Sequence, residues 1–438
     1  MKMKSFLLGA AAGIAVVGVA QAADLPVTKA EAVEYVKVCT QYGPGFFYIP
    51  GTDSCLKISG NIRADYTFNS VPSRPVTVDT NGTVQSTGSK RSLSQTSFQG
   101  RAQIGFDVRT DTDYGLLRSY LLIDAATGNS GGQSWQVGSV HGSNIYVDKA
   151  YIQFGGLTAG YAESFYAFYD NYYGDTFFAP YFGSGGIGTK QLIAYTAQFG
   201  GGFSATLSVE DPAEARLGSD TRTLAGAKMP NFIGNILYDA SWGRAQLMAA
   251  LHESSTISDV AGDTGSQNKW GYAIGAGLSL DLPLVPGAYL AVEGNYAHGA
   301  NAFTGTNEAQ FSPAGAPEVY DSYETPDGRE KQASSWSVTG EAGFDITPQL
   351  TAMVFGSYAN FDAPTGTAAD FTSYVAGAQL NYQIVKGLKI GAEVYYVNTR
   401  SDGDSGSTIV LGEGTDGTAL EKSKTDAVVG GIRIERSF

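Results

Sequence analysis

The sequence predicts an all-β protein, a 16-stranded antiparallel transmembrane β-barrel. Three observations lead to this fold class. Apolar and polar residues alternate along many short segments, the segments are even in number, and short and long connections alternate between them. No run of about 18 apolar residues follows residue 23, so no transmembrane helix is expected there. A closed barrel is then the remaining way to satisfy a backbone in lipid.

The first residues are typical of a secretory signal peptide. Lys2 and Lys4 precede an apolar stretch, 6–20, and a small-x-small site ends at Ala22. The stretch is shorter than the ~20 residues that a membrane-spanning helix needs. We therefore expect residues 1–22 to be removed on export.

Residues 56–68 show the strand pattern clearly. Ile58 and Ile62 stand at even positions, and charged residues such as Lys57 and Asp65 stand at odd positions. Successive side chains of a strand point to opposite faces, so one face is apolar and the other is charged. The same alternation predicts strands at 56–68, 98–110, 115–125, 145–155, 157–162, 189–199, 203–210, 231–240, 243–252, 269–281, 288–298, 335–346, 349–361, 371–385, 388–399 and 425–438.

Each apolar face must be buried, either against a second sheet or in lipid. Charges run along the whole polar face and aromatic residues gather near strand ends, which favours a lipid-embedded barrel over a soluble sandwich. Short connections such as 111–114 alternate with long ones such as 163–188 and 299–334. Short turns at one end and longer loops at the other are typical of such barrels. We expect 299–334 to be a polar surface loop.

Several other functions are disfavoured. The net charge of −14 argues against a nucleic-acid partner. Some membrane barrels are lipases or proteases, but His141, His252 and His298 stand in no recognisable catalytic signature. Residues 402–406 resemble a calcium loop faintly and lack its later glutamate, so no metal and no cofactor is predicted. A plugged barrel is disfavoured because residues 23–54 are too few to form a plug.

Cys39 and Cys55 are the two cysteines of the chain. The periplasm is oxidising and the cysteine count is even, so a disulfide is expected rather than two free thiols. The loop-entropy model values such a bridge at about 3 kcal/mol. We expect residues 23–55 to form a periplasmic segment that carries this structural disulfide, followed by the barrel at 56–438.

The loop 163–188 is the predicted functional centre. A bare sixteen-stranded barrel would leave a wide aqueous channel, and an infolded loop would narrow it. Glu163, Asp170 and Asp175 would then present negative charge to the lumen.

A basic wall is predicted to face this loop. Arg63, Arg101 and Arg433 occupy polar-face positions, and they lie on neighbouring strands if the last strand pairs with the first. Opposite charges on the two sides of a confined pore would create a transverse field that orients dipolar solutes. The alternative is that these charges pair with one another as ordinary salt bridges in the lumen.

The amino-terminal residues also resemble a known family. Residues 32–39 (AVEYVKVC), 42–45 (YGPG) and 46–58 (FFYIPGTDSCLKI) look like the signature of alphaproteobacterial porins of the Brucella and rhizobial type, and the terminal residues 436–438 match as well. The resemblance implies a sixteen-stranded barrel, a homotrimer, passive uptake of small hydrophilic solutes, and infolding of the loop after the fifth strand. That loop lacks the Pro-Glu-Phe-Gly-Gly motif of enterobacterial porins, so their constriction residues cannot be transferred.

The chain ends in Phe438 on the predicted lipid face of the last strand. This residue resembles the terminal aromatic signal read by the bacterial barrel-assembly machinery. We therefore predict a passive aqueous channel of the outer membrane, with its size cutoff set by 163–188. Its expected partners are outer-membrane lipid, further copies of itself, the assembly machinery, and small hydrophilic solutes and ions.

Overall fold

The structure is a computed structural model. It describes residues 37–70, 77–78, 84–85, 96–127, 143–169, 174, 176–213, 215–219, 222–258, 266–283, 285–311, 316, 318–325, 329–368, 370–402 and 422–438. The predicted signal peptide, 1–22, and two of the predicted site residues, Asp170 and Asp175, lie outside these ranges. No helix within the described ranges is both long enough and apolar enough to cross a membrane.

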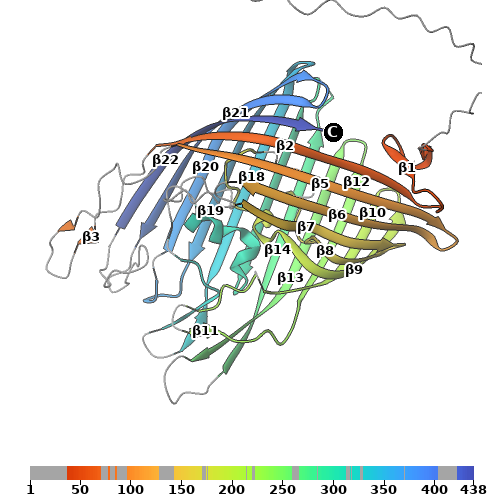
Figure 1. The fold of residues 1–438 in the computed structure, drawn as a ribbon. Helices are drawn as coiled ribbons and strands as arrows, with labels where there is room; N and C mark the ends of the chain where they lie inside the picture. Colours follow the sequence, from red (N-terminus) through yellow and green to blue (C-terminus); the bar gives the residue numbers. More distant parts are fainter. Residues whose placement is uncertain are drawn as a thin grey trace, which may run out of the picture. The chain divides into compact units, whose positions relative to one another are not determined.

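Sixteen antiparallel strands form a closed barrel (Figure 1). They are β2 (Cys55–Asn69), β5 (Thr96–Thr112), β6 (Gly115–Thr127), β7 (Ser143–Phe154), β8 (Leu157–Glu163), β9 (Thr189–Gly200), β10 (Phe203–Glu210), β12 (Asn231–Ala240), β13 (Gly243–Ser258), β14 (Ser266–Asp281), β15 (Tyr289–His298), β18 (Ser334–Thr347), β19 (Leu350–Asp362), β20 (Asp370–Val385), β21 (Leu388–Asp402) and β22 (Lys422–Ser437). Pairing of β22 with β2 closes the sheet, with Asp65 opposite Arg433.

The predicted strands are confirmed, although several extend further than the alternation suggested. β13 continues beyond residue 252 to Ser258, and β22 begins at Lys422. Residues 253–256 read Glu-Ser-Ser-Thr and carry no apolar face. They lie at the end of the barrel with the long loops, called here the loop end. The opposite end, with the short turns, is called the turn end. Alternation between apolar and polar residues is lost at the loop end, because only the part of a strand in contact with lipid requires an apolar outer face.

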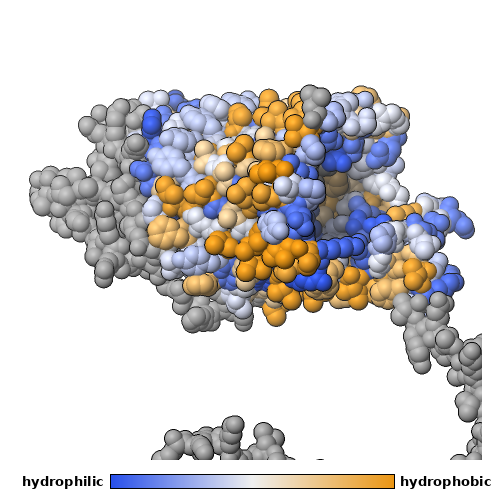
Figure 2. Space-filling view, turned by 90° about the horizontal axis from the view of Figure 1, so that it is seen from above, coloured by the Kyte–Doolittle hydropathy of each residue, from blue (hydrophilic) through white to orange (hydrophobic). Residues whose placement is uncertain are grey.

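The outer surface of the barrel is apolar. Figure 2 shows hydrophobic patches interspersed with hydrophilic residues on the face in view. Outward positions include Ile62 and Leu207, which are 58% and 76% exposed. Exposed apolar surface of this extent marks a membrane-embedded face rather than a soluble one. Charged residues at the intervening positions point into the lumen.

A small hairpin packs at the turn end. The 3₁₀ helix η1 (Thr40–Tyr42) leads into β1 (Phe46–Tyr48), which pairs with the start of β2. Cys39 and Cys55 form the expected disulfide, with their Cα atoms 6.1 Å apart. Phe46 is buried beneath the Arg109 guanidinium, 4.9 Å from its ring centre. The remaining short strands are β3 (Thr77–Val78), β4 (Val84–Gln85), β11 (Arg222–Leu224), β16 (Ser322–Glu324) and β17 (Glu330–Gln332).

Within the described residues, the loop between β8 and β9 and the loop between β15 and β18 both fold into the lumen. The loop between β8 and β9 includes η3 (Ser184–Ile187) and buries Tyr166 completely. The loop between β15 and β18 contributes η4 (Asn301–Thr304) and η5 (Thr306–Phe311). Phe303 of η4 packs edge-on against Tyr166, with ring centres 5.0 Å apart.

The expectation of a surface loop at 299–334 is therefore wrong for residues 301–304, which are fully buried. Their polar composition suggested solvent, but their polar atoms find partners inside the barrel. The Asn301 side-chain amide donates to the Tyr320 carbonyl at 3.0 Å, and its Oδ1 accepts from Ser335 at 2.7 Å. Satisfied polar groups can be buried at little cost.

Candidate pore constriction

Buried glutamates of the barrel wall hold the loop between β8 and β9. Glu210 of β10 accepts a hydrogen bond from the Phe165 N–H at 3.0 Å. Glu293 of β15 accepts from the Tyr169 N–H at 3.1 Å and from the Ser184 N–H at 2.8 Å. The loop backbone thus satisfies both carboxylates on one side of the lumen.

Two more glutamates hold the far end of the same loop. Glu393 of β21 accepts from the consecutive N–H groups of residues 177–179, at 3.0 Å for Phe178 and 2.8 Å for Ala179. Glu341 of β18 accepts from the Tyr181 hydroxyl at 2.9 Å. Burial raises the pKa of that hydroxyl, as do Tyr169 and Glu341, so Tyr181 remains a neutral donor. We call Glu210, Glu293, Glu341 and Glu393 the glutamate anchors.

The glutamate anchors are at most 3% exposed. A buried carboxylate is costly unless it is hydrogen-bonded. The loop supplies these hydrogen bonds, and its own N–H groups would be unsatisfied in a buried position without the carboxylates. Loop and wall are therefore mutually dependent, which fixes the loop inside the barrel.

Glycines in the wall make room for the aromatic rings of the loop. A Cβ atom at Gly277 of β14 would overlap the ring of Phe168, and one at Gly431 of β22 would overlap the ring of Phe178. Both glycines point into the lumen. The large aromatic content of the loop is accommodated because the wall is locally without side chains.

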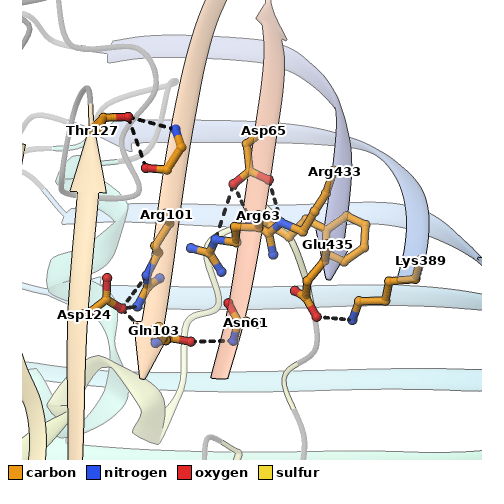
Figure 3. A network of polar contacts seen from close by, with 12 residues as sticks. Asn61, Arg63, Asp65, Arg101, Gln103, Asp124, Thr127, Lys389, Arg433 and Glu435 are labelled. Carbon is orange, nitrogen blue, oxygen red and sulfur yellow. Dashed lines mark hydrogen bonds and ion pairs between the residues drawn. The ribbon is translucent and has the colours of Figure 1, made fainter. Parts of the chain in front are cut away.

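The predicted basic residues lie together on adjacent strands (Figure 3). Arg63 is on β2, Arg101 stands directly opposite it on β5, and Arg433 is on β22. Arg433 binds Asp65 through two hydrogen bonds, at 2.7 and 2.9 Å. Arg101 binds Asp124 of β6. We call these three arginines with Asp65 and Asp124 the arginine wall.

Of the three acidic residues predicted in the loop, the structure describes Glu163, and it does not contact the arginine wall. It stands at the end of β8, and its carboxylate lies 3.1 Å from Lys149 Nζ of β7. The arginine wall thus pairs with its own aspartates, Asp65 and Asp124, rather than with Glu163. Salt bridges are present on both sides, but they do not join Glu163 to the three arginines, which is the pairing that the sequence analysis left open.

Arg433 connects the arginine wall to the loop. Its Nη2 donates to the Phe177 carbonyl at 3.1 Å, and its guanidinium lies 4.6 Å from the Phe177 ring centre and 5.2 Å from that of Phe178. Side chains of the barrel wall, from Glu210 on β10 to Arg433 on β22, therefore hold the described residues of the loop. Beyond β22, Arg63 and Arg101 retain side-chain exposures of 18% and 22%.

Sequence reasoning missed the glutamate anchors. Glu210 and Glu341 stood at expected polar-face positions, but alternation marks only which face a residue occupies. The alternation does not distinguish a lumen-facing position that a loop covers from one that is exposed to water. The loop supplied a weak signal, because an aromatic-rich loop with few charges is more easily buried than solvated.

A closed sixteen-stranded barrel with an apolar outer face and a polar lumen defines a bacterial outer-membrane β-barrel. The chain belongs to the porin family, since the family model described as the porin subfamily matches residues 24–432. The expected family resemblance is thereby confirmed.

Individual relatives agree with this assignment. Porin Omp2b of Brucella neotomae is 27% identical over 444 residues, which cover 100% of both chains. Porin Omp2b of Brucella canis is 34% identical over 248 residues, which cover 56% of this chain and 64% of the relative, less than two thirds of its length. The outer membrane channel DcaP of Acinetobacter baumannii has a similar fold, with a TM-score of 0.61 at 15% identity over 89% of this chain and 99% of DcaP.

Proposed function

We propose that this protein is a passive aqueous channel for small hydrophilic solutes and ions, and that the loop 163–188 sets its size cutoff. The observation that carries the proposal is the anchoring of this loop across the lumen by Glu210, Glu293, Glu341 and Glu393. A loop held at both ends to opposite parts of the wall narrows the channel permanently. Solutes then pass beside it.

The arginine wall and the loop would form the two sides of the narrowest part. Arg433 belongs to the wall and contacts the loop at Phe177. Solutes would therefore pass along β2, β5 and β6, where Arg63 and Arg101 keep partial exposure. Charged side chains in a confined space act on solutes more strongly than the same charges in open water.

Deletion of residues 166–182 tests the size cutoff. The shortened protein should show a larger single-channel conductance in planar bilayers and admit larger sugars in liposome swelling, because the crossing segment is gone. A matched deletion of residues 404–420, in the long loop after β21, should leave both quantities near those of the parent. Unchanged conductance in a correctly folded 166–182 deletion would contradict the proposal.

Further parts of the proposal concern export and assembly. Residues 1–22 would direct export, and Phe438 would be recognised by the barrel-assembly machinery. Phe438 is well exposed on the outer face, and its backbone exchanges two hydrogen bonds of 3.0 Å with Gly60. A homotrimer embedded in outer-membrane lipid is the proposed assembly. Membership of the porin family points to a channel rather than an enzyme, and we propose that the protein has no catalytic activity.

A further inference from the structure

We propose that Arg63 is a binding point for solutes that carry an oxyanion, and that the pore therefore favours anions although the chain has a net charge of −14. The solute class is small carboxylates or phosphates. The proposal rests on the proposed function as an aqueous channel. It adds the preferred charge of the solute and the residue that binds solutes of that charge.

Arg63 lacks the hydrogen bonds that its neighbours have. Its Nε lies 3.6 Å from Asp65, beyond hydrogen-bond distance, while both oxygens of Asp65 are taken by Arg433. The Arg63 Nε is buried and has no hydrogen-bond partner among the described residues, while the side chain as a whole keeps an exposure of 18% for contact with a solute. A guanidinium with free donors in a fixed fork matches the two oxygens of a carboxylate, or two oxygens of a phosphate.

The arginine opposite Arg63 adds a second positive charge beside it. Arg101 is its direct cross-strand partner. Like charges directly opposite each other destabilise a sheet. Asp124 pairs with Arg101 and also accepts from Gln103 at 2.7 Å, and no hydrogen bond joins it to Arg63 among the described residues. The arginine wall contains three guanidinium groups and two carboxylates, and a bound anion would balance the remaining charge.

A second basic group lies on the same side of the lumen, nearer the turn end. Arg109 and Arg118 share one carboxylate, that of Asp107, with contacts of 2.8 and 2.9 Å. Arg109 is eight residues from Arg101 on β5, about 27 Å at ~3.4 Å per residue. An anion that crosses the pore would therefore meet two groups, each with one more guanidinium than carboxylate.

Other charges face this path as well. Asp148 of β7 interacts with both Arg101 and Lys149, and Glu163 pairs with Lys149. Lys389 pairs with Glu435 at 3.3 Å. These groups carry three negative and two positive charges. Each lysine is paired with one glutamate, and Asp148 lies beside Arg101, so Arg63 remains the guanidinium of this path without a hydrogen-bonded carboxylate among the described residues.

The negative net charge of the chain does not contradict an anion preference. The glutamate anchors are covered by the loop and hydrogen-bonded to it, so their carboxylates do not face a passing solute. Charges in the exposed loops are screened within ~8 Å at physiological salt. The sign of the lumen beside β2 and β5 is set by the residues that remain exposed there.

The test uses the full-length protein in planar bilayers under a KCl gradient. The reversal potential of the parent should indicate preference for chloride, and Arg63→Gln should shift it toward potassium. Succinate and inorganic phosphate, added separately, should reduce the KCl current. Either should do so about tenfold less effectively in Arg63→Gln, because a charge-assisted hydrogen-bond pair is lost. A current reduced only by succinate identifies carboxylates as the ligands, and one reduced only by phosphate identifies phosphates.

Two control variants separate binding from general charge. Lys389→Gln removes the same formal charge from a paired residue, and it should leave the effect of both anions at the parental level. Arg63→Lys keeps the charge without the fork, so it should keep the reversal potential but weaken the anion effect. A parent that prefers potassium, or equal behaviour of Arg63→Gln and Lys389→Gln, overturns the inference. A folded parent with no conductance at all would instead overturn the proposed channel function.

Discussion

At the scale of single residues, one buried aspartate joins three segments at the loop end. Asp321 accepts hydrogen bonds from the Leu217 N–H at 2.9 Å and the Asn301 N–H at 3.0 Å, and its Oδ2 lies 3.4 Å from His252 Nε2. Leu217 and Asn301 belong to different loops, and His252 belongs to β13. The side chain is fully buried, so each contact is shielded from water.

Asp321→Asn should lower the free energy of unfolding by about 2 kcal/mol, because an amide nitrogen would replace one of the accepting oxygens and leave buried donors unsatisfied. Urea unfolding in detergent measures this change. Asp239→Asn is the matched control, since Asp239 pairs with Arg244 on the surface at 3.1 Å and is half exposed. The control should cost less than about 1 kcal/mol. Equal costs for the two variants would show that Asp321 has no special role.

At the scale of elements, the infolded loop depends on its far anchor. Glu393 accepts hydrogen bonds from residues 177–179, which lie more than 210 residues earlier in the chain. Glu393→Ala removes all three acceptor contacts at once. The loop segment should then leave the wall, and the single-channel conductance should rise and fluctuate more.

The control for this prediction is Glu435→Ala. Glu435 lies on the neighbouring strand and pairs with Lys389 rather than with the loop backbone. Recordings in planar bilayers should show parental conductance noise for the control. If Glu393→Ala were as quiet as the control, the remaining anchors would be sufficient to hold the loop.

The strands could be predicted from the sequence because lipid imposes a strict pattern on them. Outward residues of a membrane-spanning segment must be apolar. Ile58 and Ile62 therefore show which side of their strand faces the lipid. No such rule acts inside the lumen. Asp65 stood at a polar-face position of its predicted strand, but only the register with β22 and β6 shows which arginines Asp65 and Asp124 bind. The buried position of residues 301–304 depends on partners such as Ser335, which no local pattern indicates.

At the scale of the whole molecule, the barrel is closed by main-chain hydrogen bonds between β2 and β22 and not by its disulfide. The Cys39–Cys55 bridge fixes only the small hairpin at the turn end. Replacing both cysteines by serine should therefore cost about 3 kcal/mol in the loop-entropy model, confined to that hairpin. Proteolysis should cut residues 40–54 faster in the variant.

The barrel of the double serine variant should still resist unfolding in unheated detergent gels, with the mobility of the parent. Reduction of the parent with dithiothreitol is an independent check, because it opens the same bridge without a substitution. Loss of the compact gel form in either case would show that the hairpin contributes to closure of the barrel.

The position of Arg433 has a consequence for the order of assembly. This residue lies near the end of the chain, yet it contacts both Asp65 on the first barrel strand and Phe177 in the loop between β8 and β9. The contact with Phe177 spans 256 residues. Contacts of such long range form late in folding, since a large loop must close first. The contact between Arg433 and this loop therefore forms only when the last strand has joined the first, so an incompletely closed barrel would lack one of the contacts that hold the loop inside it.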